Sequence, residues 1–143
     1  MTDPLLADDA EPDSPGLLQE GLTLDIDRRA AEWQPFIADI EAHAAFLAQA
    51  LALPPVEISL VLGDDALLAQ LNEAYRDKPG PTNVLSFPAM DLDPSDRAAA
   101  LLPGSLLGDI VMSFDTLARE AHAGGQPLTS HALHLLTHGL LHL

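Results

Sequence analysis

The sequence predicts an α+β domain of mixed α/β layers, with one small, mostly four-stranded mixed sheet packed with helices. Two patterns indicate this class. Segments in which apolar and polar residues alternate, typical of half-buried strands, are interspersed with segments whose apolar residues recur every three or four positions, typical of amphipathic helices. A chain of 143 residues is long enough for a single core. No apolar run approaches the roughly 20 residues that cross a membrane.

The first elements are predicted to be a strand, a helix and a second strand. The first strand is expected at 22–27, where leucine and isoleucine alternate with polar residues. A helix follows, with Pro35 at its first position and an apolar repeat that ends near Pro54, because proline suits a helix start and interrupts a helix interior. The run VEISLVL at 56–62 has the alternation of the second strand.

A further helix is predicted after this strand, capped by Asp64 or Asp65, whose carboxylates can accept a hydrogen bond from the first turn. The side chains that this helix is expected to bury are Leu67, Leu68, Leu71 and Tyr75. A short strand between prolines is expected at 83–87, and a polar, proline-containing loop at 91–105.

The last third of the chain is predicted to form a strand and two helices. The strand is expected at 108–114, and Asp115 is expected to cap a helix that ends at Gly124. Thr129 or Ser130 is expected to cap the closing helix.

The composition is strongly acidic, with 22 Asp and Glu against 6 Lys and Arg and a net charge of −16. This balance excludes broad electrostatic binding of nucleic acid, because lysine and arginine supply most of that affinity. Any RNA site must therefore be small and local. Residues 1–20 contain acidic but no basic side chains and are predicted to be a flexible tail, which leaves 21–143 as the single domain.

The sequence contains no cysteine, so disulfides and thiolate metal sites are excluded. A zinc site would need histidine and carboxylate ligands. The N-terminal residues lack the basic and apolar regions of a secretory signal, and a cytoplasmic location is therefore expected.

Four histidines recur in the closing helix at spacings of three and four: His131, His134, His138 and His142. Helix geometry places all four on one arc, with leucines 133, 136, 140 and 143 expected on the opposite, buried side. The i,i+4 spacing of His138 and His142 allows both rings to bind one metal ion. The alternative is a polar stripe on a helix surface, and the spacing alone leaves both interpretations open.

Gly139 follows His138 at the position where a zinc protease helix carries its glutamate base, so a protease is disfavoured. Glycine inside a helix costs about 1 kcal/mol relative to alanine. Its presence indicates a close approach to the backbone, either by a functional group or by the packing of the helix against the sheet.

Two of the few basic residues, Arg76 and Lys78, lie where a helix is expected to end in a turn rich in proline and glycine. The planar guanidinium suits a phosphate group, and functional groups are common in such turns. Compensation of the helix dipole by two cations is the alternative.

Three blocks, LNEAYRDKPGPTNVLSFP, LGDIVMS and HLLTHGLLHL, together resemble the YbeY-type endoribonucleases over residues 55–143. Residues 1–53 match only in their general strand-then-helix layout. The resemblance implies a zinc-dependent endoribonuclease specific for single strands, acting in 3′-end maturation of 16S ribosomal RNA and in ribosome quality control. The implied partners are ribosomal RNA, components of the small ribosomal subunit, and a GTPase or ribosomal protein, with no membrane.

The resemblance also implies roles for individual residues. The family motif H-G-x-L-H-L-x-G-Y-D-H binds one zinc ion through its histidines, and His138 and His142 match the first two ligands. The third falls six residues after His142, so the sequence is interpreted as ending inside the motif and is expected to bind zinc poorly. Arg76 matches the functional arginine. His134 is expected to support the ligands or to replace the missing one, and Lys78 is a candidate RNA contact.

In the implied mechanism, zinc acts as a Lewis acid on the phosphodiester while Arg76 stabilises the negative charge that develops on it. The sequence does not decide between a water-derived hydroxide and the RNA 2′-hydroxyl as nucleophile. Two alternatives remain at this point. One is a zinc hydrolase of another substrate, such as a peptide, and the other is a non-catalytic module that docks on the ribosome or on a GTPase.

Overall fold

The computed structural model of the protein describes residues 22–89 and 105–143. The predicted acidic tail, and the predicted loop apart from Ser105, lie outside these residues. The elements of the described part are β1 (Leu22–Arg28), the 3-10 helix η1 (Ala31–Phe36), α2 (Ile37–Ala50), β2 (Val56–Gly63), α3 (Asp65–Arg76), β3 (Val84–Pro88), β4 (Ser105–Ser113), α5 (Phe114–Ala123) and α6 (Leu128–Leu141). No helix in this part of the chain is long and apolar enough to cross a membrane.

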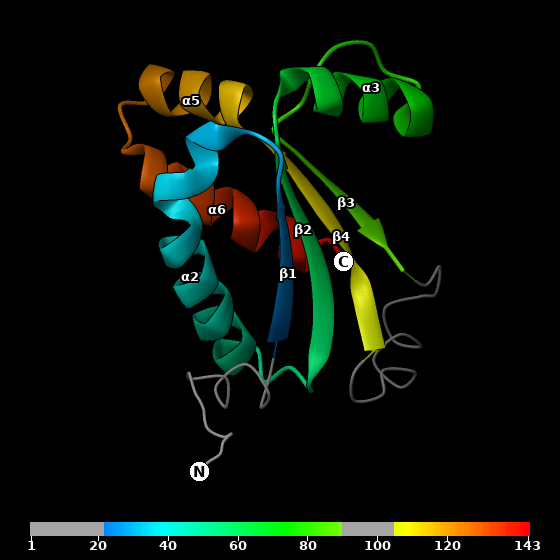
Figure 1. Cartoon of the computed structure of the whole chain (residues 1–143), viewed down its shortest axis with the longest axis vertical. Coiled ribbons are helices and arrows are strands. Elements are labelled where there is room, and N and C mark those ends of the chain that lie inside the picture. The colour runs from blue at the N-terminus through cyan, green and yellow to red at the C-terminus, as the bar shows by residue number, and fades with distance from the viewer. Residues whose placement is uncertain (1–21, 90–104) are drawn as a thin grey trace.

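The four strands form one mixed sheet in the order β1-β2-β4-β3 (Figure 1). β2 lies parallel to both β1 and β4, while β3 runs antiparallel to β4 and forms an edge of the sheet. The parallel pair β1 and β2 is joined through η1 and α2, as parallel neighbours require a crossover connection. The predicted α+β class, with one small four-stranded mixed sheet, is confirmed.

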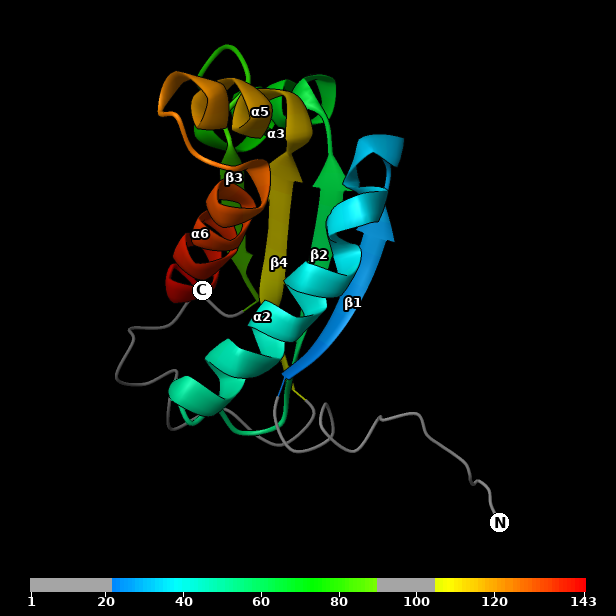
Figure 2. The ribbon, with the colours of Figure 1, turned by 90° about the vertical axis from the view of Figure 1, so that its left-hand side faces the viewer.

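The two faces of the sheet are covered unequally. Figure 2 looks onto the face covered by α2 and α6, where Leu60, Ile110 and Met112 are fully buried in the main core. On the opposite face, α3 packs over a much smaller core that includes Leu68 and Val111. Because successive side chains of a strand point to opposite faces, β4 contributes to both cores.

A buried tryptophan, which the sequence analysis did not single out, closes one end of the main core. Trp33 of η1 is completely buried, and its Nε1 donates a hydrogen bond of 2.9 Å to the carbonyl oxygen of Gly63 at the end of β2. Its ring also contacts the edge of the Phe114 ring at 5.4 Å between centroids. The side chain thus ties η1 to the ends of β2 and β4.

Of the predicted helix caps, one is confirmed and two are wrong. The side chain of Asp64 accepts a hydrogen bond from the backbone N–H of Leu67 and caps α3. Asp115 does not cap α5, because its carboxylate accepts the backbone N–H of Asp65 at 3.0 Å and so serves the other helix. Neither Thr129 nor Ser130 caps α6, because that helix already begins at Leu128, directly after a proline.

Asp65 links the start of α3 to the start of α5. Its carboxylate accepts hydrogen bonds from the hydroxyls of Ser113 (2.6 Å) and Thr116 and pairs with Arg119 at 2.9 Å. Burial raises the pKa of the Asp65 carboxyl, but these hydrogen bonds and the charge of Arg119 outweigh burial and hold the pKa below its ordinary value. The ionised carboxylate is therefore the form that the folded protein stabilises.

Replacing Asp65 with asparagine is expected to lower the free energy of unfolding at neutral pH by about 1–2 kcal/mol, because hydrogen bonds to a charged acceptor are lost. A pKa lowered in the folded state contributes stability that is present above the unfolded pKa of about 3.9 and is lost as the pH falls through the folded value. Urea unfolding across the acid range should therefore show the two proteins converging at low pH.

The control is Asp25→Asn, which removes an exposed carboxylate of β1 and should change stability by no more than about 0.5 kcal/mol. A gap between Asp65→Asn and the unchanged protein that stays constant down to the acid limit would contradict this role of the Asp65 charge.

Candidate active site

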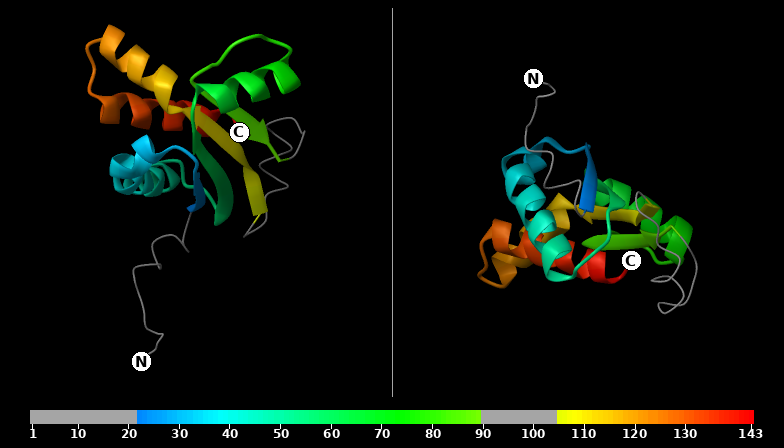
Figure 3. Two further views of the ribbon diagram at one scale, coloured as in Figure 1. Left: turned by 45° about the horizontal axis from the view of Figure 1, so that its top comes forward. Right: turned by 90° about the horizontal axis from the view of Figure 1, so that it is seen from below.

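A cavity of about 580 Å³ lies along the edge strand β3, between the C-terminal end of α3 and that of α6. It is lined by residues 84–87 of β3, by Tyr75 and Arg76 of α3, by His138 of α6 and by His142 directly after α6. Seen from below in Figure 3, the C-terminal end of α6 lies alongside β3. The cavity therefore brings together all three residues to which the family resemblance gives a central role.

Close packing against the sheet fixes the position of α6. A Cβ atom on Gly139 would lie 3.0 Å from Cγ2 of Ile110 and 3.2 Å from Cγ2 of Val84. The hydroxyl of Ser86 donates a hydrogen bond of 2.8 Å to the carbonyl oxygen of Gly139. Of the two explanations for this glycine, the structure supports packing of the helix on the sheet. The same packing holds His138 at the rim of the cavity.

The three histidines of α6, and His142 directly after it, have different environments. His138 and His142 are exposed, and their ring centroids are 4.3 Å apart. His134 is exposed as well, but its ring stacks on that of His131 at 6.0 Å, and it does not line the cavity. In the described part of the chain, no group of three or more His, Cys, Asp or Glu side chains is placed to hold a metal ion.

His131 is buried, unlike the other three histidines of the predicted arc, and Leu136, Leu140 and Leu143 on the opposite side are buried as predicted. The buried face of α6 comprises His131, Ala132, Leu135, Leu136, Gly139 and Leu140, whereas Leu133 is only partly buried. The buried face of α6 thus includes part of the side that carries the histidines. This is because α6 packs against α5 as well as against the sheet.

His131 Nε2 donates to Glu120 of α5 at 2.9 Å, and Asn83 donates to the same carboxylate at 3.0 Å. Burial raises the pKa of the Glu120 carboxyl, but the hydrogen bonds from His131 and Asn83 outweigh burial and hold that pKa below its usual value. This cluster joins α6 and α5 to the start of β3. His131 thus has a structural role at some distance along the helix from the cavity.

The turn after α3 sets the position of Arg76. Asp77 ends the helix in the left-handed conformation, with φ at 54°. Asn72 then holds the turn at two points, since its backbone carbonyl accepts the N–H of Lys78 and its side-chain amide donates to the carbonyl of Gly80 at 3.0 Å. Lys78 is exposed and is not among the residues that line the cavity. Asn72 was not predicted as a functional residue, because its burial is a signal that only the fold provides.

The predicted burial of Tyr75 is wrong, since 69% of this residue is exposed. Leu68, one of the leucines on the same face of α3, is completely buried against the sheet. Tyr75 lies at the other end of the helix, beside the edge strand β3, where no further strand covers it. Its ring instead contacts that of Phe87 at 5.4 Å and an interplanar angle of 68°. Phe87 was likewise predicted only as part of a strand, not as a residue of the site.

The fold and the cavity define a mixed α/β domain with a histidine pair and an arginine gathered beside an edge strand. The family Endoribonuclease YbeY matches residues 24–143, and the chain belongs to this family. Endoribonuclease YbeY of Parvibaculum lavamentivorans is 43% identical over 127 residues, covering 86% of this chain and 69% of the relative. That of Ruegeria pomeroyi is 47% identical over 133 residues, covering 85% and 79%.

A solved structure has a similar fold. The solution structure of a Thermotoga maritima protein aligns with 85% of this chain and 71% of its own, with a TM-score of 0.58 and 19% sequence identity. This similarity concerns the fold alone. The assignment to a family of endoribonucleases rests on the sequence relatives.

Proposed function

We propose that the protein is a zinc-dependent endoribonuclease that cleaves single-stranded RNA at the cavity beside β3. Its proposed role is 3′-end maturation of 16S ribosomal RNA and ribosome quality control in the cytoplasm. The observation that carries the proposal is the shared cavity of Arg76, His138 and His142, which come from two helices far apart in the sequence. Membership of the endoribonuclease family supports the same reaction.

Arg76 is suited to bind the scissile phosphate. Within the described residues, no ion pair or hydrogen bond engages its guanidinium, and the residue is exposed at the cavity. A guanidinium presents a planar fork of donors that matches two phosphate oxygens. It stabilises charge that develops on the phosphate without transferring a proton. The nucleophile is either water or the RNA 2′-hydroxyl, and in either reaction Arg76 can stabilise the charge on the phosphate.

His138 and His142 fit a zinc site in part. The rings are adjacent, exposed and free of protein hydrogen bonds in the described chain, and neutral imidazole is a common zinc ligand. The third histidine of the family motif falls six residues after His142, beyond residue 143. A zinc ion bound with an open coordination position would polarise the phosphodiester and lower the pKa of water.

The acidic charge of the chain indicates that it needs partners to bind ribosomal RNA. With a net charge of −16, the protein gains little affinity from general phosphate contacts. We therefore propose that components of the small ribosomal subunit, and a ribosomal protein or GTPase, supply part of the affinity for ribosomal RNA. With affinity supplied by these partners, the cavity beside β3 needs only to position a single phosphate.

The test compares the 143-residue chain with a chain continued through the third motif histidine. The shorter chain is expected to bind zinc at least about 10- to 100-fold more weakly, the loss that removing even a supporting partner of a ligand causes. The longer chain should cleave a single-stranded RNA carrying the 3′ end of the 16S precursor, and its His138→Ala variant should not. Zinc is measured by elemental analysis and titration, and cleavage by gel electrophoresis.

His122→Ala is the matched control, because it removes an exposed histidine of α5 outside the cavity. Tight, stoichiometric zinc in the 143-residue chain would overturn the expectation that zinc binding requires the third motif histidine. If the His138→Ala variant processed RNA as well as the unchanged protein, a non-catalytic docking module would be the better description. Zinc-dependent cleavage of casein but not of RNA would favour a peptide hydrolase.

A further inference from the structure

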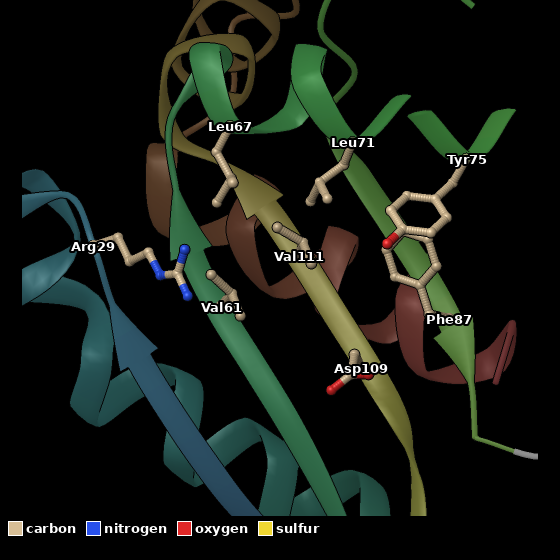
Figure 4. A pocket seen from close by; sticks show the side chains of 8 residues that line it. All are labelled: Arg29, Val61, Leu67, Leu71, Tyr75, Phe87, Asp109 and Val111. Atoms are coloured by element: carbon tan, nitrogen blue, oxygen red, sulfur yellow. The ribbon is translucent and has the colours of Figure 1, made fainter. Parts of the chain in front are cut away.

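A second cavity, of about 380 Å³, opens on the other face of the sheet beside α3 (Figure 4). Its floor is formed by Val61 of β2 and Val111 of β4, and its wall by Leu67 and Leu71 of α3. The cavity exists because α3 covers only part of this sheet face, so that the small core beneath the helix is open on one side. Its volume falls within the range of about 300–1,000 Å³ that is usual for ligand sites.

Tyr75 lines both this cavity and the candidate active site. One side of its ring contacts Phe87, while most of the residue is exposed. In Figure 4 the two rings lie next to one another at the edge of the cavity. A ligand in the second cavity would therefore lie next to a ligand held by Arg76.

Two polar side chains line the otherwise apolar cavity. Arg29, which follows β1, extends its guanidinium over β2 near Val61, and Asp109 lies on β4 below Val111 (Figure 4). Arg29 uses one N–H to pair with Asp27 at 2.9 Å, and a guanidinium has five donors in total. The cavity thus offers apolar surfaces, an exposed aromatic ring, a donor and an acceptor.

We propose that this second cavity binds an unpaired nucleobase of the RNA strand, adjacent to the phosphate held at Arg76, with Tyr75 as the stacking surface. The proposal rests on the proposed endoribonuclease function. A nucleobase has flat apolar faces and an edge with both N–H donors and acceptors, which Asp109 and Arg29 can satisfy. It is also uncharged, so the carboxylates of Asp109 and Asp27 do not repel it as they would a phosphate.

The test measures binding of a fluorescein-labelled single-stranded RNA of about 12 nucleotides by anisotropy, with chelator present to prevent metal-dependent cleavage. Tyr75→Leu is expected to weaken binding about tenfold, within the range found for loss of one base stack. Tyr75→Phe keeps the ring and should bind like the unchanged protein. Phe46→Leu is the control, because Phe46 is an aromatic residue of α2 that is 61% exposed and lines neither cavity.

A second set of RNAs carries one abasic nucleotide, moved along the strand. At one position, the abasic RNA should bind the unchanged protein about tenfold more weakly, whereas Tyr75→Leu should bind that RNA and the intact RNA equally. This loss of additivity assigns the missing base to Tyr75. Because Tyr75 is exposed, the leucine variant should also unfold at the same temperature as the unchanged protein.

The outcomes separate the two proposals. If Arg76→Lys weakens RNA binding but Tyr75→Leu binds like Phe46→Leu, the nucleobase site is wrong and the endoribonuclease proposal stands. An abasic penalty that persists in Tyr75→Leu likewise overturns the site. If the unchanged protein binds no single-stranded RNA, the nucleobase site fails, whereas the endoribonuclease proposal is decided separately by RNA cleavage with the chain that carries the third motif histidine.

Discussion

Replacing Arg76 with lysine is expected to lower kcat for RNA cleavage about 100- to 1,000-fold, the usual cost of removing one donor that stabilises transition-state charge. Lysine keeps the positive charge but loses the planar fork, so it cannot contact two phosphate oxygens in the same geometry. Because the negative charge on the phosphate grows during the reaction, the loss should be larger in kcat than in the affinity for the ground state.

The measurement is steady-state cleavage of a labelled single-stranded RNA by protein that carries the third motif histidine. Arg28→Lys is the matched control, since it makes the same exchange at an exposed residue of β1 outside both cavities. Both variants should unfold at the temperature of the unchanged protein, because Arg76 is exposed and has no partner in the described chain. A kcat for Arg76→Lys close to that of Arg28→Lys would remove Arg76 from the reaction.

Local sequence patterns predicted the elements of this domain better than the way in which they pack. The alternation in β2 and the cap at Asp64 depend on neighbours in the sequence, and the structure confirms both. The role of Asp115 depends on a residue 50 positions away. No local pattern carries such a contact, and the prediction that Asp115 caps its own helix was therefore wrong.

The strand order explains the error at Tyr75. The apolar spacing of α3 correctly indicated that Leu68 is buried, but it could not indicate that β3 is an edge strand. Since strand order depends on pairing between distant segments, the sequence pattern could not predict that Tyr75 is left exposed against Phe87. This exposure is what makes Tyr75 available to a ligand.

The candidate site was predictable only in part, because it too depends on contacts between segments far apart in the sequence. The i,i+4 pair of His138 and His142 is a local feature, and its adjacency follows from helix geometry. That Arg76 lines the same cavity depends on the placement of α3 and α6 at either side of β3. From the sequence, Arg76 could be assigned to the same site as the two histidines only through the resemblance of several sequence blocks to one family.

Adding a methyl group at Gly108 is expected to lower the stability of the fold strongly. The pairing of β2 with β4 shifts register here, with Glu57 opposite Leu106 and Ile58 opposite Gly108, as in a β-bulge. A Cβ atom on Gly108 would lie 2.5 Å from the carbonyl oxygen of Phe87. This oxygen belongs to the backbone of β3, so relief of the clash requires the edge strand to move.

Gly108→Ala is therefore expected to lower the free energy of unfolding by about 3 kcal/mol, at the upper end of the cost of overpacking. The melting temperature should fall by about 10 °C. Both cavities should be disturbed as well, because residue 87 lines each of them. Urea and thermal unfolding give the stability, and RNA binding gives the effect on the site.

The control is Gly124→Ala at the end of α5, where φ is −90° and a Cβ atom would meet nothing closer than 3.4 Å. This change should alter stability by no more than about 0.5 kcal/mol. Equal stability of the two alanine variants would mean that β3 shifts at no cost. In that case the contact between the Cβ atom and the carbonyl oxygen of Phe87 would not limit the packing of β3 on β4.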